Sequence, residues 1–308
     1  MNFLPRTIVP KAPPIKMQGI KTKLVPLIAR SIAWSGDGRW IEPFFGSGVV
    51  GLNIMPQEAI FADTNKHLID LYRRIKEGSI NGYTVRAYLE YEGKLLLNKG
   101  ESHYYAIRER FNERADPLDF IFLSRSCFNG MMRFNKKGLF NVPFCRKPNR
   151  FRPALVTKIV NQVEWARKAM QGKDWHFVAQ DWRITVAGTK PGDIVYCDPP
   201  YVGRHTDYYN GFTDDEADDL AKALINSPAG FALSMWLENK YRRNAYVDRW
   251  FADFPQRTMS HFYHVGPSER LRNQMTEVVI LSQNAAAKPA ASLGQSLPLF
   301  KSPELIDV

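Results

Sequence analysis

The sequence contains few of the residues that stabilise secreted or metal-binding proteins. Among its 308 residues there are three cysteines, Cys127, Cys145 and Cys197. They form no C-x-x-C pair and their number is odd, which argues against a disulfide framework or a structural zinc site and favours the reducing cytoplasm. The six histidines are scattered without metal-ligand spacing, so we expect no metal site.

Long apolar runs are also missing. No segment reaches the roughly 18 uninterrupted apolar residues of a membrane span, and residues 1–23 lack the apolar stretch of a secretory signal, so we expect no membrane contact. With 44% hydrophobic and 24% charged residues, the composition excludes a fully disordered chain. The exception is the end of the chain, 284–308, where alanine, proline and serine predict a disordered tail.

Acidic residues are scarce in one part of the chain. There are 42 Lys and Arg against 31 Asp and Glu, and the formal net charge of +11 favours an acidic partner. Residues 125–152 contain no Asp or Glu, and they contain five phenylalanines, four asparagines and eight basic residues, which are Arg125, Arg133, Lys136, Lys137, Arg146, Lys147, Arg150 and Arg152. Nucleic-acid binding requires cations for phosphates, amides for base edges and rings for stacking. The alternative is a solvated loop whose phenylalanines belong to the core.

Strand-like and helix-like segments alternate along most of the chain. The predicted strands are 40–44, 59–63, 175–179, 193–197, 230–234, 257–263 and 276–282. The predicted helices are 49–54, 65–76, 81–126, 153–170, 214–225 and 239–252. The alternation indicates an α/β fold, with helices on both faces of a sheet. The stretch 79–152 interrupts it, so we predict a main domain in two pieces, 10–78 and 153–283, with an inserted helical and hairpin domain between them.

Two glycines lie between the first strand and the helix that follows it, in Phe44-x-Gly46-x-Gly48. Glycine lets the backbone turn tightly and lets a ligand approach the main chain, and nucleotide-like ligands bind at this edge of an α/β sheet. Asp63 ends the next strand. Its separation from Gly46 along the sequence is close to the roughly 20 residues expected for a ribose-binding acid. An ordinary strand-to-helix turn is the alternative for the two glycines alone.

The most specific motif is Asp198-Pro199-Pro200-Tyr201, which follows the apolar strand ending at Cys197. The prolines fix the backbone and remove N–H donors, which leaves carbonyl oxygens free to accept hydrogen bonds. Asp198 and the Pro199 carbonyl can then accept the two hydrogens of an exocyclic amine, and Tyr201 offers a face on which a base can stack. A rigid turn after an edge strand is the alternative.

These motifs resemble those of the Dam-type family of DNA N6-adenine methyltransferases, which use S-adenosylmethionine. The resemblance runs from about Lys16 to Leu281 and covers Lys16-x-x-Gly19-x-Lys21, Glu42-Pro43-Phe44-x-Gly46-x-Gly48, Asp63, Arg125 to Asn135, Gly138, Phe140 to Phe144, and Asp198 to Tyr201. It implies a Rossmann-like methyltransferase sheet, with 79–152 as the domain that recognises DNA. It also implies a site-specific enzyme that flips an adenine out of duplex DNA, with GATC as the expected target.

The resemblance also assigns roles to residues. The implied catalytic residues are Asp198, Pro199, Pro200 and Tyr201. The implied cofactor contacts are Met17, Lys21, Glu42, Phe44, Gly46, Gly48, Asp63, Asp181 and Asp198. The implied DNA contacts are Lys16, Arg125, Phe128, Asn129, Met131, Arg133, Asn135, Lys136, Lys137 and Pro143. Arg133 would read a guanine through O6 and N7, and Phe128 would wedge into the base stack.

Other interpretations stay open at the level of sequence. A DNA cytosine-N4 methyltransferase, whose catalytic tetrad often begins with Ser, is the nearest. An RNA or protein-glutamine methyltransferase and a catalytically inactive DNA-binding regulatory protein follow. Residues His205, Tyr208 and Tyr209 suggest a lid over a flipped base, or a plain surface loop. The segment 295–300 resembles peptides that bind the bacterial sliding clamp, or has no role. We expect a cytoplasmic monomer.

Overall fold

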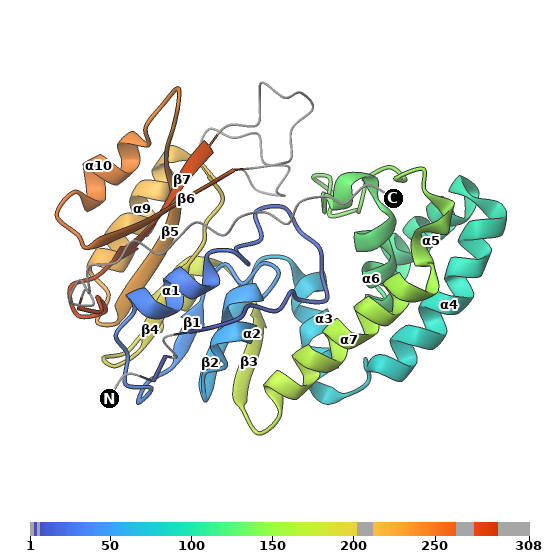
Figure 1. The fold of residues 1–308 in the computed structure, drawn as a ribbon, viewed down its shortest axis with the longest axis horizontal. Coiled ribbons are helices and arrows are strands. Elements are labelled where there is room, and N and C mark those ends of the chain that lie inside the picture. The colour runs from blue at the N-terminus through green and yellow to red at the C-terminus, as the bar shows by residue number, and fades with distance from the viewer. Residues whose placement is uncertain (1–2, 5–6, 202–211, 263–273, 289–308) are drawn as a thin grey trace, which may run out of the picture.

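The computed structural model describes residues 3–4, 7–201, 212–262 and 274–288, and the structural statements below concern these residues (Figure 1). Its helices are α1 (Val25–Ser31), α2 (Val49–Ile54), α3 (Lys66–Glu77), α4 (Gly82–Lys99), α5 (Glu101–Arg114), α6 (Pro117–Ser126), α7 (Pro153–Met170), α8 (Trp182–Ala187), α9 (Asp214–Ile225) and α10 (Ala245–Phe251), with the 3-10 turns η1 (Phe128–Gly130) and η2 (Pro148–Phe151). Its strands are β1 (Trp40–Glu42), β2 (Glu58–Asp63), β3 (Asp174–Ala179), β4 (Ile194–Cys197), β5 (Gly230–Asn239), β6 (Gln256–Phe262) and β7 (Gln274–Leu281).

The strands form one sheet in the order β3-β2-β1-β4-β5-β7-β6. The first five strands in this order are parallel, and β7 pairs antiparallel with both β5 and β6. The chain winds from β1 toward β3 on one side and from β4 toward β6 on the other. The strand order therefore reverses between β1 and β4, and in open α/β sheets ligands bind outside the carboxyl ends of the strands at such a point.

Alternate residues of each central strand pack against different groups of helices. Trp40 and Tyr196 point into the larger core cluster, which includes buried residues of α1, α2 and α3. Their neighbours Ile41 and Val195 point into the second cluster, which includes residues of α8, α9 and α10. A parallel sheet needs this cover because both of its faces are apolar. The α/β fold with helices on both faces is confirmed.

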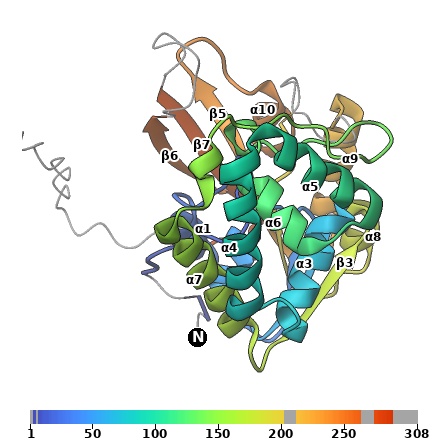
Figure 2. The ribbon, with the colours of Figure 1, turned by 90° about the vertical axis from the view of Figure 1, so that its right-hand side faces the viewer.

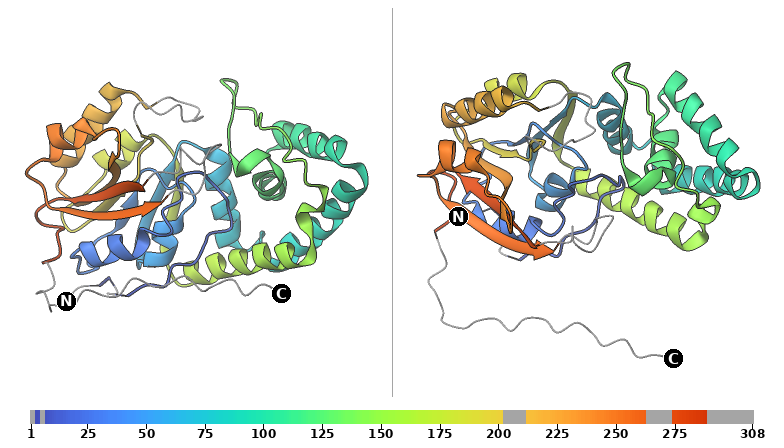
Figure 3. Two further views of the ribbon diagram at one scale, coloured as in Figure 1. Left: turned by 45° about the horizontal axis from the view of Figure 1, so that its top comes forward. Right: turned by 90° about the horizontal axis from the view of Figure 1, so that it is seen from above.

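The segment 79–152 forms the helical lobe that lies beside the sheet in Figures 1 and 3 and faces the viewer in Figure 2. It contains α4, α5 and α6, followed by an antiparallel excursion, residues 127–145, that we name the basic hairpin. The hairpin has bridges between Cys127 and Phe144 and between Phe134 and Phe140. Buried residues of α4, α5 and α6 belong to the same hydrophobic cluster as the sheet, so the lobe and the sheet share one continuous core. A separate inserted domain therefore stays a prediction.

Several element boundaries differ from the prediction. The expected helix 81–126 is three helices, because Gly100 (φ 60°) and Ala115 (φ 55°) adopt conformations that end α4 and α5. The expected helix 239–252 is wrong in its first half, where β5 ends at Asn239 and a turn delays α10 until Ala245. The short helices α1 and α8 were not predicted.

The predicted start of the disordered tail, residue 284, also lies too early in the sequence. Ala33 donates its backbone N–H to Ala285 O (2.8 Å), and Ala287 donates to Ser31 O (2.8 Å). Ala286 forms an isolated bridge with Ile32. Residues 285–287 therefore form part of the packed fold, while 289–308 lie outside the described residues.

Candidate active site

The carboxyl ends of four adjacent parallel strands carry the residues that the sequence singled out. The glycine turn follows β1, Asp63 ends β2, Asp181 lies just beyond β3, and Asp198 follows β4. Neighbouring parallel strands end at the same edge of a sheet, so these four features form one row. The row spans the β1–β4 switch point, where the fold leaves room for a ligand.

The glycine turn is built around the carboxylate of Asp63. Gly46 N–H donates to Asp63 Oδ2 (2.9 Å), and Asn65 N–H donates to Asp63 Oδ1 (2.8 Å). Burial raises the pKa of Asp63, and the two N–H bonds oppose that effect. A Cβ placed on Gly46 would meet only Phe44 O at 4.0 Å, so the main chain there is open to a ligand. Each oxygen of Asp63 retains a lone pair for a ribose hydroxyl.

Gly48 has a different reason to be glycine. Its φ of 71° is left-handed, and a Cβ there would lie 2.5 Å from Cζ of Phe45. The Phe45 ring is buried against Phe61, Tyr72 and Phe177, and cannot move aside. Gly48 thus allows α2 to begin directly over the core. In the predicted glycine turn, the fold itself requires glycine at position 48, and the main chain at Gly46 is open to a ligand.

Asp181 and Phe44 flank the row from the α8 side. Asp181 accepts a hydrogen bond from Arg183 N–H (2.8 Å) as the N-cap of α8. The Phe44 ring lies 6.4 Å from that of Trp182, which is the next residue after Asp181. The flat face of Phe44 and the Asp181 carboxylate therefore lie on the same side of the switch point. They suit an adenine ring and its amine.

Glu42, in contrast, points into the protein. It is 1% exposed and accepts a hydrogen bond from Trp40 Nε1 (2.7 Å). Burial raises its pKa to about 8, so the carboxyl is largely protonated at neutral pH. Its Oε1 lies beneath the first turn of α2, so close to Gly51 that a Cβ added there would be 2.8 Å from this oxygen. Met17 is partly buried and packs against the main core. The structure gives both residues a packing role.

The centre of the site is an ion pair between Lys21 and Asp198. Lys21 Nζ lies 2.9 Å from Asp198 Oδ1, and also donates to Gly19 O (3.0 Å). Burial alone would lower the pKa of Lys21, but the adjacent Asp198 carboxylate raises it well above its ordinary value. Burial raises the pKa of Asp198, and Lys21 partly offsets this. The lysine side chain is 5% exposed and the aspartate 22%, so the carboxylate is the accessible partner.

Tyr201 brings a residue into the site that the sequence analysis did not identify. Its hydroxyl donates to Glu277 Oε1 (3.3 Å) on β7, and Lys21 Nζ lies 5.2 Å from its ring centre. Glu277 is 2% exposed. The available signal was a lone acid directly before the apolar run Val278 to Leu281, because a carboxylate buried in a strand needs partners. One lysine thus lies among two carboxylates and a ring.

The thiols take no part in this arrangement. Cys197 is buried at the end of β4, and burial raises its pKa well above the ordinary value. Burial raises the pKa of Cys127 to about 12. Within the described residues no cluster of His, Cys, Asp and Glu could hold a metal ion.

No helix in the described part of the chain is long and apolar enough to span a bilayer.

The basic hairpin separates its rings from its cations. Phe134 stacks on His67 of α3, while Phe140 and Phe144 are buried against α5. Phe128 is the exception, at 50% exposure. The core alternative is therefore right for three of these phenylalanines, and Phe128 remains a candidate for insertion between bases.

The polar residues of the basic hairpin also divide into two groups. The Asn135 side chain accepts hydrogen bonds from Lys137 N–H (2.9 Å) and Leu139 N–H (3.1 Å), so it shapes the turn. Arg133 Nε donates to Asn141 Oδ1 (3.3 Å) near the surface. Lys136 and Lys137 are exposed at the tip. The tip therefore presents cations on a turn whose backbone is fixed.

The base of the basic hairpin is tied to the N-terminal segment. Arg125 is 7% exposed and donates to Pro14 O and to Gln162 Oε1 (2.8 Å), so its guanidinium is engaged inside the protein. Burial, with Arg150 nearby, lowers its pKa to about 10. The Lys16 side chain lies over Gly130, where a Cβ would come within 2.7 Å of it. The structure thus brings Lys16 beside the η1 turn.

The remaining predicted DNA contacts lie on the η1 turn or next to it. Asn129 has a left-handed backbone (φ 53°) and is exposed, as is Pro143, whose carbonyl accepts from Phe128 N–H (2.8 Å). Met131 is partly buried against the core. His205, Tyr208, Tyr209 and the segment 295–300 lie outside the described residues.

The fold and the row of side chains define a class of protein: an α/β protein with a Rossmann-like sheet that carries acidic side chains at its switch point. Sequence comparison gives the family. The model of D12 class N6 adenine-specific DNA methyltransferases matches residues 18–265, so the chain belongs to that family. Methyltransferases of this kind generally use S-adenosylmethionine. The predicted family and enzyme class are confirmed.

Individual relatives agree with the family match. The Retron Ec67 DNA adenine methylase of Escherichia coli is 31% identical over 217 residues, 68% of this chain and 71% of that protein. A DNA adenine methylase of Serratia marcescens is 35% identical over 194 residues, 61% of this chain and 66% of that one. The Type II methyltransferase M.FokI of Planomicrobium okeanokoites is 28% identical over 281 residues, 87% of this chain but 42% of that longer protein.

Proposed function

We propose that this protein transfers a methyl group from S-adenosylmethionine to the N6 amine of an adenine that is flipped out of duplex DNA. The observation that carries the proposal is the Lys21–Asp198 pair (2.9 Å). It places a fixed and accessible carboxylate at the switch point of the sheet, one strand away from the open glycine turn. GATC-like sites are the first targets to test.

The residues around the glycine turn fit this cofactor. Asp63 is held by two backbone N–H groups and can accept ribose hydroxyls, while Gly46 leaves the main chain open. Phe44 and Asp181 offer a stacking face and an acceptor for an adenine amine. The bound cofactor would supply a methyl group on a sulfonium, and these residues would orient it toward Asp198.

The turn at Asp198 and Pro199 suits the amine of a substrate base. The lone pair of an adenine amine is delocalised into the ring, which makes the nitrogen a weak nucleophile. Lys21 occupies Oδ1 of Asp198, and within the described residues no hydrogen bond engages Oδ2. Oδ2 and the Pro199 carbonyl could accept the two amine protons, which would localise the lone pair and direct it at the methyl group. Tyr201, oriented through Glu277, would stack on the base.

The basic hairpin suits the DNA side of the reaction. Phe128 is half exposed and can fill the gap left by a flipped base. Arg133 carries a planar guanidinium for O6 and N7 of a guanine. Asn129, Met131, Pro143 and Lys16 lie beside Phe128 on the η1 side, while Lys136 and Lys137 are placed to meet phosphates.

The sharpest test replaces Asp198. We expect Asp198→Asn to abolish transfer of labelled methyl groups to duplex DNA, while the DNA dissociation constant changes less than about threefold. Asp253→Asn, at an exposed aspartate far from the row, is the matched control and should behave as wild type. Normal single-turnover rates in Asp198→Asn would overturn the catalytic assignment. Methylation of cytosine by the wild-type protein would favour the cytosine-N4 alternative.

Three finer parts of the proposal need separate tests. Sedimentation of the protein alone and with a short duplex would check the expected monomer. A pull-down with the peptide 290–304 would check whether residues 295–300 bind the bacterial sliding clamp, and absence of binding would end that idea. Sequencing that detects N6-methyladenine, on DNA from a methylase-free host expressing the chain, would give the target sequence.

A further inference from the structure

The turn after β5, residues 239–244, is closed by hydrogen bonds and projects from the same edge of the sheet as the proposed catalytic residues. We name this edge the catalytic edge, and the row of Gly46, Asp63, Asp181 and Asp198 along it the catalytic row. Asn239 Oδ1 accepts hydrogen bonds from Tyr241 N–H (2.9 Å) and Arg242 N–H (3.1 Å), and Asn239 N–H donates to Arg242 O (2.9 Å). Asn244 closes the turn by donating through Nδ2 to Trp236 O (2.9 Å). These bonds fix the backbone at the tip of the turn.

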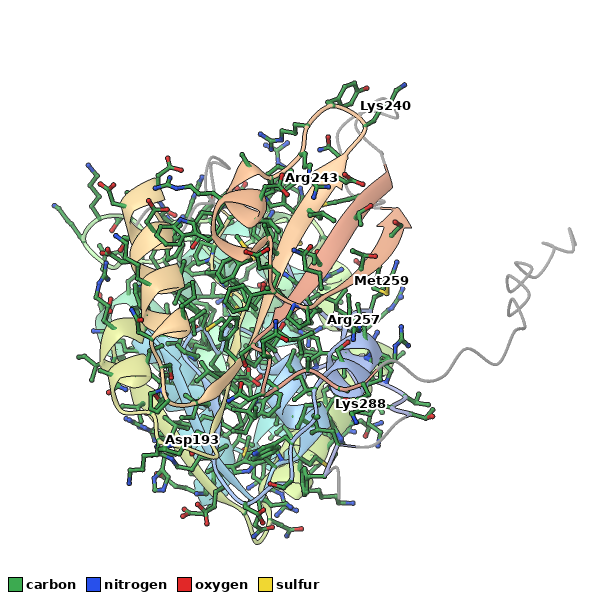
Figure 4. The ribbon with its side chains drawn as sticks, turned by 90° about the vertical axis from the view of Figure 1, so that its left-hand side faces the viewer. Asp193, Lys240, Arg243, Arg257, Met259 and Lys288 are labelled. Carbon is green, nitrogen blue, oxygen red and sulfur yellow. The ribbon has the colours of Figure 1, made fainter. Side chains whose placement is uncertain are left out.

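This turn stands above the catalytic row. In the register of the sheet Cys197 lies beside Leu233, and Asp198 follows at the end of β4. β5 continues from Leu233 to Asn239, a rise of about 20 Å, and β7 accompanies it up to Met275. Figure 4 shows this extension, with Lys240 and Arg243 at the end of the sheet opposite Asp193. Figure 1 shows the turn and the basic hairpin on either side of the catalytic edge.

At the tip of this turn, carboxylates neutralise one cation and leave two others exposed. Arg243 is held by Glu238 (3.0 Å) and Asp248 (2.9 Å), so it serves the turn itself. Lys240 and Arg242 are exposed and have no acidic partner among the described residues. Arg242 lies over the Trp236 ring (4.9 Å), and Tyr241 is 71% exposed between the two cations. Because hydrogen bonds already fix the backbone of this turn, little backbone entropy would be lost on binding.

We propose that Lys240, Tyr241 and Arg242 form a second DNA-contacting surface, which binds the phosphate backbone of the duplex across the catalytic edge from the basic hairpin. The inference rests on the proposed function, and deepens it by naming where the far side of the duplex is held. Charge complementarity selects the partner, because phosphates are the anions that a duplex over this edge would bring to the tip. Contacts of this kind position the duplex and carry no base information.

The test measures how DNA affinity depends on salt. We expect Lys240→Ala/Arg242→Ala to weaken binding of a GATC-containing duplex and of a scrambled duplex by the same factor, about tenfold near 0.1 M salt. The slope of log affinity against log salt should fall by about 2. The matched control is Lys173→Ala/Lys190→Ala, which removes the same charge from the opposite edge of the sheet, where Lys173 precedes β3 and Lys190 precedes β4. The control should retain the wild-type slope.

The outcomes separate this inference from the proposed function. If the wild-type protein neither binds nor methylates DNA, the proposed function fails. If it does both and the double variant keeps the wild-type slope, this inference alone is overturned. An equal loss in the control pair would also overturn it, because the effect would then be one of net charge. Since Arg242 packs on Trp236, the single variant Lys240→Ala, with an expected slope change of about 1, gives a second measurement that does not disturb this packing.

Discussion

The catalytic edge and the basic hairpin differ in the burial of their charged side chains. At the catalytic edge Lys21 is buried and paired with Asp198, with Glu277 close by. At the hairpin tip Lys136 and Lys137 are exposed, and the protein presents them to solvent. A buried pair fixes two groups in one geometry, whereas exposed cations are accessible to a partner in solution. Under the proposed function, chemistry is preorganised at the first region and DNA is bound at the second.

The largest expected effect comes from breaking the buried pair. Lys21→Met leaves Asp198 without its cation, and we expect the rate of methyl transfer to fall by more than about 100-fold. Without Lys21 the pKa of Asp198 rises further, and the carboxylate is the form that accepts the amine proton. The acid limb of the rate against pH should therefore move to higher pH. Lys21→Arg, which keeps the charge, should recover part of the rate, and an unchanged pH profile in Lys21→Met would contradict this account.

A smaller effect is expected at the exposed region, and it concerns specificity. Arg133→Ala should reduce discrimination at one guanine of the target by about 1–3 kcal/mol. Lys137→Ala is the control on the same hairpin, and should weaken binding to all duplexes equally. Methylation mapped over a library of site variants measures both. An unchanged target sequence in Arg133→Ala would remove Arg133 as a base reader.

Glu277 tests whether the ring of Tyr201 is positioned through its hydroxyl. We expect Glu277→Gln and Tyr201→Phe each to slow single-turnover transfer by about threefold to tenfold, since each weakens one hydrogen bond. The double variant should be no slower than the worse single variant, because both changes affect the same contact. Fully additive losses would show that the two residues act separately.

Stability, in contrast to rate and specificity, should respond to the buried carboxyl of Glu42. Burial raises the pKa of Glu42 to about 8, so between its ordinary pKa and pH 8 the folded protein holds a proton that the unfolded chain has lost. The free energy of unfolding therefore falls as pH rises through this window, by about 1.4 kcal/mol for each pH unit. Glu42→Gln should remove most of that fall, measured by urea denaturation at pH 5 and pH 8. The exposed Glu58→Gln is the control, and an equal effect there would contradict the assignment.

Much of the catalytic edge could be predicted because it follows strands. The ends of strands are visible as apolar runs that stop, and Asp63 and Asp198 each follow such a run. The parallel arrangement then brings them to one edge. Glu277 could not be placed in this way, because β7 pairs antiparallel with β5 and only the three-dimensional sheet brings it to Tyr201.

The hairpin was harder to predict in detail. Its composition indicates nucleic-acid binding, but composition does not tell which phenylalanines are buried. Phe134 stacks on His67, which lies far away in the sequence. In the sequence Arg125 resembles the other basic residues of 125–152, yet it is buried against the N-terminal segment and α7. Long-range packing decides both cases, and no local pattern records it.

The shared core between sheet and helical lobe limits how this protein can exchange its specificity. Phe120, Phe122 and Leu123 of α6 belong to the same buried cluster as Phe61 of the sheet. A cassette of residues 79–152 taken from a relative would cut through that cluster and mismatch its packing. A graft limited to the exposed residues of the strip from Arg133 to Asn141, with Phe134 and Phe140 kept, would leave the cluster whole. Under the proposed function, new target sequences are therefore more readily engineered at the tip than by exchange of the lobe.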